Sequence, residues 1–361
     1  MTQTMTWAGL DVHARSTQAV AVDARSGELA RARFGGGIES VVEWLASLTG
    51  PVHAVYEAGP TGYGLARAGG ELGLRIDVIA PGKTPRAAAD RIKTDRRDAE
   101  LLVRQLMAGT LHPIHVPSPA LEAARDLVRA REDVRCDLSR ARHRVSKLLL
   151  RHGEVYPKDR STWTREHRRW LSSRRFDEPN TQLAYIDALA AVDGLTHRRD
   201  ALAERLSHVA ADAELWPVVS RLRAFRGIDT LTALALVCEV GDWHRFQRPD
   251  QLAAWIGLVP SLSQSGESRT SGGITKTGSR HARRLLVEAA WHYQRPPRIG
   301  ATLRNRQHGQ PDHILQIAWR AQHRLYRVHQ RLRQRGKHPN LATAAAAREL
   351  ACFCWAAVTA P

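Results

Sequence analysis

Residues 6–34 read TWAGLDVHARSTQAVAVDARSGELARARF, and this opening stretch decides the fold class of the N-terminal region. Residues 6–12 and 17–23 predict two short strands, and a Ser26-Gly27 turn leads into a third over 28–34. Asp11 lies inside the first of these strands, where an ionised carboxylate among apolar residues needs a partner. The stretch therefore predicts the beginning of a sheet and singles out one acid within it.

Strands and helices alternate after this opening. A helix with apolar positions between 41 and 48 precedes an apolar strand at 52–56, which ends at Glu57. The Gly-Pro-Thr-Gly that follows breaks the strand and opens a helix. Residues 74–79 predict another strand, and a helical pattern runs from about residue 85 to residue 107. This order predicts a mixed-sheet α/β domain, which we assign to residues 1–120.

Two long helices are expected in the middle of the chain, residues 121–215. Apolar residues recur at near-helical spacing through 121–152 and again through 181–215, in otherwise charged sequence. This pattern predicts an antiparallel, coiled-coil-like helical hairpin, with a more polar connector between its arms.

The C-terminal region, residues 216–361, is expected to be mostly helical. Its first segment predicts a helix, a turn at Gly227 and an apolar helix, similar to a helix-hairpin-helix element whose backbone amides meet a phosphate. A further helix is expected at 251–258, followed by a Ser/Gly-rich loop over 260–279. Basic helices at 280–293 and 312–335 and an alanine-rich terminal helix complete the region.

Charge is distributed unevenly along the chain. Lys and Arg outnumber Asp and Glu by 54 to 36, which gives a net charge of +18. Residues 261–361 hold 17 basic and 4 acidic residues, so they contribute +13 of that excess. Arginine dominates there, and its planar guanidinium suits bidentate contacts to phosphate. Nucleic acid is therefore the expected partner.

Several other classes of protein are excluded by composition. The four cysteines contain no CxxC pair, so a disulfide scaffold and a cysteine zinc site are both disfavoured, and a cytoplasmic location is expected. The N-terminus lacks the layout of a signal peptide, and no uncharged apolar stretch approaches the length of a membrane span. No GxxxxGK[ST] loop is present, so no ATP-driven step is expected.

Four acids are placed so that they could hold metal ions together. Asp11 and Glu57 belong to two predicted strands, while Asp95 and Asp98 lie three residues apart on the predicted helix and so face the same side. Carboxylate oxygens are the ligands that Mg²⁺ prefers, and two such ions can stabilise the attacking and leaving oxygens of a phosphate. The set predicts a metal site for phosphoryl-transfer chemistry.

The motifs that carry these acids resemble those of a known family. They are GLDVH at 9–13, YEAGPTGYG at 56–64, DRIKTDRRDAE at 90–100 and GLVPSLSQSGESRTSGGITKTGSRHARRLLVEAAW at 257–291. Together they resemble the DEDD insertion-sequence transposases of the family numbered one hundred and ten, described as bridge-RNA-guided recombinases. The resemblance covers nearly the whole chain.

This resemblance implies a fold, a reaction and partners. It implies an N-terminal RuvC-like (ribonuclease H-type) domain, a coiled-coil insertion and a C-terminal transposase domain. The four acids would bind Mg²⁺, with Mn²⁺ as a substitute, and Ser265 would be the nucleophile that forms a phosphoserine. The family's Ser-Ser-Gly-Gly run corresponds here to Gln264-Ser265-Gly266-Glu267. Because both flanking residues differ, a shifted alignment would place the nucleophile at Ser263 or Ser268 instead. The implied partners are donor and target double-stranded DNA, a structured bridge RNA and further copies of the chain in a dimer or tetramer.

Basic residues near the serine and on the later helix are the expected nucleic-acid contacts. Those near the serine would neutralise charge on the reacting phosphate. The candidates are Lys276, Arg280, Arg283, Arg284, Arg320, Arg324, Arg327 and Arg331, together with the backbone of Gly227 in the turn described above.

Three alternative functions remain open at this point. In a RuvC-like junction nuclease, water would attack the phosphate and Ser265 would be idle. A nucleic-acid-binding regulator would have lost catalysis, which the presence of all four acids disfavours. An actin-like sugar kinase shares the three-strand opening but needs glycine-rich phosphate loops that the sequence does not show.

Overall fold

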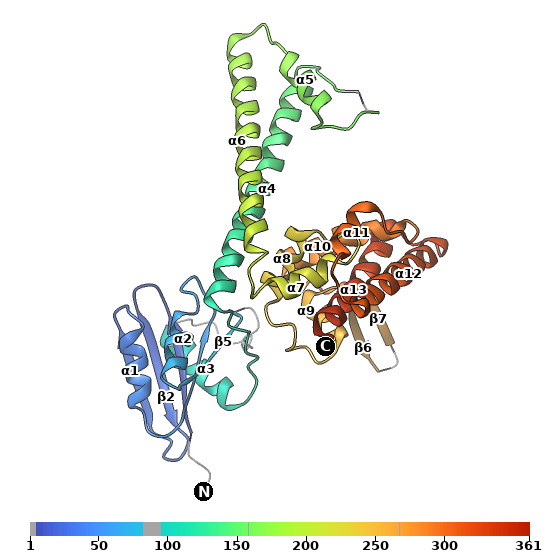
Figure 1. Cartoon of the computed structure of the whole chain (residues 1–361). Coiled ribbons are helices and arrows are strands. Elements are labelled where there is room, and N and C mark those ends of the chain that lie inside the picture. Colours follow the sequence, from blue (N-terminus) through green and yellow to red (C-terminus); the bar gives the residue numbers. More distant parts are fainter. Residues whose placement is uncertain (1–4, 82–94, 158, 267) are drawn as a thin grey trace. The chain divides into compact units, whose positions relative to one another are not determined.

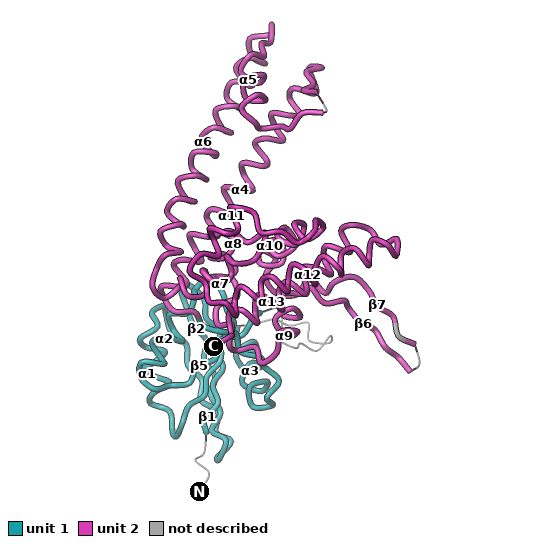
Figure 2. The backbone as a smooth tube through the Cα atoms, turned by 45° about the vertical axis from the view of Figure 1, so that its right-hand side comes forward, with its two compact units in different colours: residues 1–116 teal, residues 117–361 magenta. Residues whose placement is uncertain are grey.

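The chain folds into two compact units, Met1–Val116 and Pro117–Pro361 (Figure 2). The computed structural model describes residues 5–81, 95–157, 159–266 and 268–361. The segment expected to form a helical hairpin and the C-terminal region fall within the second unit. A division of that unit at residue 215 stays a prediction.

Unit 1 is built on a five-stranded mixed sheet of order β3-β2-β1-β4-β5. β1 is antiparallel to β2, and β2 to β3, whereas β1–β4 and β4–β5 are parallel. The elements are β1 (Thr6–Val12), β2 (Thr17–Asp23), β3 (Leu29–Phe34), α1 (Glu39–Ser47), β4 (Val52–Glu57), α2 (Gly64–Glu71), β5 (Arg75–Ile79) and α3 (Asp95–Met107) (Figure 1). The expected mixed-sheet α/β fold is confirmed. Of the helix expected at 85–107, residues 85–94 lie outside the described residues.

The two faces of this sheet pack against different helices. On β1, Ala8 and Leu10 belong to the core that includes Val41 and Leu45 of α1 and Leu65 of α2. Because side chains alternate along a strand, the odd-numbered positions of β1 lie on the opposite face, which α3 covers. There, Val20 of β2 packs with Ala99 and Val103 of α3, and Val55 of β4 packs with Leu102 and Leu106. Asp11 is two residues after Gly9, and Glu57 is two residues after Val55. Both acids therefore lie on the face of the sheet that α3 covers.

Two long helices begin unit 2. They are α4 (Pro119–Arg151) and α6 (Pro179–Val209), with the short α5 (Arg165–Ser173) between them in sequence (Figure 1). Buried residues on α4 fall at Val134, Leu138, Ala141, Val145 and Leu149, a spacing of three and four residues that is typical of a helix–helix seam. Leu138, Ala141, Val145 and Leu149 share a core with Tyr185 and Val192 of α6.

The rest of unit 2 is a helical body with one β-hairpin. Its elements are α7 (Trp216–Arg223), α8 (Thr230–Val240), α9 (Pro249–Ile256), β6 (Pro260–Ser265), β7 (Ser268–Ile274), α10 (Arg280–Ala290), η2 (Trp291–Gln294), α11 (Ala301–Gln307), α12 (Asp312–Gln334) and α13 (Pro339–Thr359). One core includes buried Leu234 of α8, Leu286 of α10, Leu325 of α12 and Leu350 of α13. The expected basic helices are present as α10 and α12.

The terminal helix α13 is long and apolar. Among the described residues it is the one helix whose length and composition would allow it to cross a membrane. However, Ala346, Ala347, Leu350 and Cys354 are fully buried against the other helices of the body. Its apolar composition is therefore explained by its place in the core.

Candidate active site and nucleic-acid interface

Asp11 and Glu57 stand at the ends of two neighbouring parallel strands. The β1–β4 register ends with Leu10 opposite Tyr56, so Asp11 and Glu57 are the next residues of their strands. Both side chains are half-buried. Because the carboxyl ends of parallel strands meet at one edge of a sheet, this register places the two acids next to each other on the α3 face.

Helix α3 adds the other two acids because it packs directly on β1. A Cβ at Gly9 would collide with the backbone oxygen of Ala99 and lie 2.9 Å from the Val103 side chain, so only glycine permits this approach. Asp95 and Asp98 occupy the first turn of the helix. The close packing at Gly9 therefore holds the acidic end of α3 beside the end of β1.

His13 joins this acidic cluster. Its Nε2 lies 3.2 Å from Asp11 Oδ2 and 3.9 Å from Asp95 Oδ1. Among the described residues, Asp11, His13 and Asp95 offer ligand atoms that all lie within 4.8 Å of one another. Sequence reasoning missed His13, although its position two residues after Asp11 places it on the same face of an extended chain.

The electrostatics of the cluster fit a bound cation. Burial raises the pKa of Asp11; the His13 charge opposes this effect, and the carboxylates of Asp95 and Asp98 add to it. Crowded carboxylates of this kind are costly when they share no positive ion, and a divalent cation with oxygen ligands would relieve the repulsion. Asp11, His13 and Asp95 therefore fit a metal site, and Glu57 lies at the end of the neighbouring strand.

Ser265 lies at the tip of a β-hairpin rather than in a loop. The expectation of a loop over 260–279 was wrong for 260–265 and 268–274, which form β6 and β7. Ser265 pairs with Ser268 and Ser263 with Thr270, and the left-handed Gly266 (φ 56°) allows the chain to turn. Serine and glycine are common in loops, but here backbone pairing fixes them. Ser263 and Ser265 are exposed and lie on one face of β6.

The base of this hairpin is anchored to the end of α9. The Thr275 N–H donates to Val259 O at 2.9 Å, and the Lys276 N–H donates to Gly257 O at 3.1 Å. Nη1 of Arg283 donates to Ile256 O at 2.6 Å and to Thr277 O at 2.7 Å. Arg283 was expected to contact nucleic acid. Instead its guanidinium joins the end of α9 to the segment that follows β7, and so holds the base of the hairpin in place.

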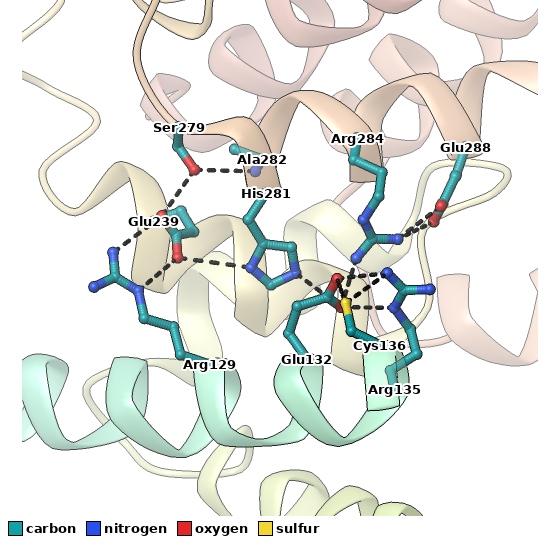
Figure 3. Close-up of polar contacts among 10 residues, drawn as sticks. All are labelled: Arg129, Glu132, Arg135, Cys136, Glu239, Ser279, His281, Ala282, Arg284 and Glu288. Atoms are coloured by element: carbon teal, nitrogen blue, oxygen red, sulfur yellow. Dashed lines mark hydrogen bonds and ion pairs between the residues drawn. The ribbon is translucent and has the colours of Figure 1, made fainter. Parts of the chain in front are cut away.

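A buried polar network joins α4, α8 and α10 just after the hairpin (Figure 3). Ser279 Oγ donates to Glu239 Oε2 at 2.8 Å and accepts from the Ala282 N–H at 3.1 Å, which caps α10. Arg129 Nε donates to Glu239 Oε1 at 3.2 Å. Burial opposes ionisation of Glu239, but the His281 ring, whose Nδ1 lies 3.6 Å from Oε1, and the hydrogen bonds from Arg129 and Ser279 outweigh it and lower its pKa to about 2. The network ties the hairpin segment to α4.

Arg284 belongs to the same network. It bonds Glu132 of α4 at 2.7 Å and Glu288 of α10 at 2.6 Å (Figure 3). Burial raises the pKa of Glu132, but hydrogen bonding from Arg135 and the charge of Arg284 outweigh it, and the pKa is lowered. By contrast, Lys276 and Arg280 are exposed. The basic residues expected near the serine therefore have different surroundings. Arg284 bonds acids on two helices, whereas Lys276 and Arg280 face solvent.

Helix α12 presents a basic exposed face. Arg320, Arg327 and Arg331 are exposed along it. Arg324 is exposed too, but its Nε and Nη2 donate to the two carboxylate oxygens of Glu349 at 2.7 and 3.0 Å. This bidentate pair raises the pKa of Arg324 and neutralises its charge.

Gly227 lies between α7 and α8, where the helix-hairpin-helix-like pattern predicted a turn. Its φ of 85° is in the left-handed region, and a Cβ there would lie 2.6 Å from the Ala289 carbonyl oxygen. Glycine is needed at this position because the turn packs directly on the end of α10.

The sequence matches known proteins over most of its length. Residues 219–303 match the family described as Transposase IS116/IS110/IS902 family, and residues 8–153 match the DEDD_Tnp_IS110 family, described as Transposase. Protein y4qE of Sinorhizobium fredii, named as a transposase, is 41% identical over 96% of this chain and 87% of its own. The transposase for insertion sequence element IS1533 of Leptospira borgpetersenii is 30% identical over 92% and 97%. The chain thus belongs to the IS116/IS110/IS902 family of transposases, enzymes that act on DNA.

Proposed function

We propose that this transposase cuts and rejoins DNA through a covalent phosphoserine at Ser265, assisted by divalent cations at Asp11, Glu57, Asp95 and Asp98. The observation that carries the proposal is the acidic cluster, in which two adjacent strand ends and the first turn of α3 converge on one face of the sheet. The match of the chain to transposases supplies the substrate class.

The four acids would hold the metal, which we take to be Mg²⁺ or Mn²⁺. When bound, such ions stabilise negative charge on the attacking and leaving oxygens of a phosphate. Asp11 and Asp95 lie close enough to share an ion, the charge of Asp98 acts on Asp11, and Glu57 follows Tyr56 at the end of the neighbouring strand. His13 would donate a hydrogen bond to Asp11 and fix the orientation of its carboxylate.

Ser265 would supply the nucleophilic oxygen. Its Oγ would give up its proton and attack the phosphorus of one strand, the bond from phosphorus to the leaving oxygen would break, and that oxygen would take up a proton to become a free hydroxyl. Attack on the phosphoserine by a hydroxyl of another strand would reverse these steps and rejoin the DNA, which conserves the bond without ATP. Exposure at the tip of an anchored hairpin suits this role.

A structured bridge RNA would choose the DNA by base pairing, with unit 1 and the α4–α6 helices contacting the RNA backbone. This division of labour matches RNA-guided enzymes in which the protein reads shape and the RNA reads sequence. The acids and Ser265 belong to different units, so the proposal requires that they meet at one phosphate, within a chain or between copies in a dimer or tetramer. We place the protein in the prokaryotic cytoplasm, on nucleoid DNA when bound.

The nucleic-acid contacts would come chiefly from exposed basic side chains. Lys276 and Arg280 flank the hairpin, and Arg320, Arg327 and Arg331 follow the exposed face of α12. Arg283, Arg284 and Arg324 have hydrogen bonds within the protein, so we assign them a secondary role in binding.

A junction nuclease of the RuvC type is the second candidate function. The acidic cluster lies wholly within unit 1, so unit 1 could activate water without Ser265. The two candidates differ in their products, because hydrolysis yields free ends whereas covalent catalysis yields joined recombinants.

Reconstituted recombination tests the proposal. Purified, nuclease-treated protein is combined with the two DNA ends of its insertion sequence, with or without RNA transcribed from beside the gene, and with Mg²⁺ or a chelator. The proposal predicts recombinants only when RNA and Mg²⁺ are both present. Recombination in chelator would overturn the metal role, and equal recombination without RNA would overturn RNA guidance.

A further inference from the structure

A basic pocket of about 530 Å³ lies where the α7–α8 turn meets η2 and α11. Three arginines and a histidine line it, namely Arg226, His292, Arg298 and Arg306. The acid among its lining residues is Asp229, whose Oδ1 accepts the Thr232 N–H at 2.8 Å and so caps α8. The pocket thus gathers more positive charge than it neutralises.

Two of the three guanidinium groups of this pocket are held by hydrogen bonds to backbone carbonyls. Arg306 Nη1 donates to Ile228 O at 2.6 Å, and Arg226 Nη1 donates to Pro296 O at 2.9 Å. Arg306 Nε is buried and has no hydrogen-bond partner among the described residues. Burial lowers the pKa of both side chains. An anion would supply the missing acceptor and offset the cost of holding these charges together.

The shape of the pocket depends on Gly227. A Cβ at this position would lie 3.0 Å from Cδ2 of His292 and would press against Ala289, so the backbone itself forms this part of the wall. A wall of backbone beside two fixed guanidinium groups suits a phosphate group, whose oxygens accept several hydrogen bonds at once.

The loop that carries Arg298 is bonded to the buried side of α12. The Arg298 N–H donates to Gln322 Oε1 of α12 at 3.0 Å. We propose that the pocket binds one backbone phosphate of the DNA substrate. This inference rests on DNA being the substrate, and it needs neither Ser265 chemistry nor metal at the acids.

Binding of a fluorescein-labelled DNA duplex to full-length Ser265→Ala protein, titrated in chelator over a range of salt, tests the pocket. Arg298→Ala is the test variant because its exposed side chain can be removed without disturbing the core. We expect weaker binding and a slope of log affinity against log salt that is shallower by about 0.9, as for one lost phosphate contact. Arg304→Ala, which removes an exposed arginine of the neighbouring helix α11 outside the pocket, is the matched control and should leave the slope unchanged.

The outcomes separate the pocket from its alternatives. Equal slope changes for Arg298→Ala and Arg304→Ala would mean that general surface charge is responsible, and would overturn the pocket. If Arg298→Ala changed the salt slope for binding of an RNA duplex but not for binding of a DNA duplex, the assignment of the pocket to DNA would be wrong. No cleavage occurs in this assay, because the protein carries Ser265→Ala and the buffer contains chelator. A negative result for the pocket therefore does not count against the proposals for Ser265 and the metal site. Likewise, failure of those proposals would not count against the pocket.

Discussion

At the end of β1, the Asp11 carboxylate has two acidic neighbours, Asp95 and Asp98, and one basic neighbour, His13. Its ionised form is disfavoured by burial and by like charge, so the pKa is raised. A cation would reverse this penalty, since it stabilises the ionised form of each carboxylate ligand. The same residue is therefore a source of local repulsion without metal and a ligand with it.

Asp11→Asn is expected to abolish strand cleavage while leaving the fold intact. Asparagine removes the anionic ligand but also removes the like-charge repulsion, so the melting temperature in chelator should not fall. Glu57→Gln, Asp95→Asn and Asp98→Asn should likewise lose cleavage. Cleavage assays in Mg²⁺ and thermal unfolding in chelator measure the two effects.

Asp23→Asn is the control for this substitution. The Asp23 side chain accepts the N–H groups of Arg25 and Ser26 in an exposed turn, and an asparagine oxygen can do the same. Cleavage by this variant should be unchanged. Undiminished cleavage by Asp11→Asn would contradict the metal site.

At the scale of elements, the β6–β7 hairpin depends on its anchorage to α9. Arg283 bonds two carbonyls at its base, so Arg283→Ala should lower the cleavage rate at saturating DNA and reduce stability by roughly 1–3 kcal/mol. DNA affinity and its salt dependence should change little, because the guanidinium is used within the protein. Single-turnover cleavage and DNA titrations measure these effects.

Arg280→Ala gives the opposite expectation. Arg280 is exposed, so its loss should weaken DNA binding and leave stability unchanged. If Arg283→Ala instead reduced the salt dependence of binding with no loss of stability, Arg283 would be a phosphate contact and not an anchor.

The network around Glu239 makes the stability of unit 2 depend on pH. The folded pKa of about 2 lies below the ordinary 4.5, so ionised Glu239 stabilises the fold above the unfolded pKa, and this contribution is lost as pH falls from about 5 towards 2. The shift corresponds to on the order of 3 kcal/mol at neutral pH. Glu239→Gln should therefore destabilise the protein at pH 7 by about this amount and much less at pH 3.

Chemical denaturation at the two pH values measures this difference. Asp250→Asn, which removes an exposed carboxylate paired with Arg248, should cause no measurable change at either pH. An equal loss of stability for Glu239→Gln at pH 7 and pH 3 would show that packing, not charge, is responsible.

The elements of unit 1 could be predicted because their signals are local: alternating apolar residues, turn residues and helix periodicity. The β6–β7 hairpin could not, since its serines and glycines have the composition of a loop and only the backbone pairing of its two strands distinguishes it. Ion pairs between residues far apart in the sequence could not be predicted either. Arg284 pairs with Glu132 across 152 positions, and Arg324 with Glu349 across 25, so the sequence could not show which arginines are already neutralised.

At the scale of the whole molecule, the C-terminal excess of positive charge should dominate DNA binding. Replacing Arg320, Arg327 and Arg331 together by alanine should flatten the slope of log affinity against log salt, by roughly 0.9 for each phosphate contact removed. Arg324→Ala should have less effect, because Glu349 already neutralises this charge. Fluorescence titrations at several salt concentrations measure the slopes.

An unchanged slope in the triple variant would place the binding face elsewhere. A slope change for Arg324→Ala as large as the average change per arginine in the triple variant would show that the Glu349 ion pair opens when DNA binds.

The central claim joins the two units: carboxylates in unit 1 and a serine in unit 2 act on one phosphate. Peptide mapping of full-length protein trapped on a nicked, suicide DNA substrate tests it most directly. The account predicts a nucleotide on Ser265, no adduct in Ser265→Ala, and normal adducts in Ser263→Ala and Ser268→Ala. A nucleotide on Ser263 or Ser268 would move the nucleophile along the hairpin. Cleavage with no adduct on any serine would contradict covalent catalysis and favour hydrolysis by water.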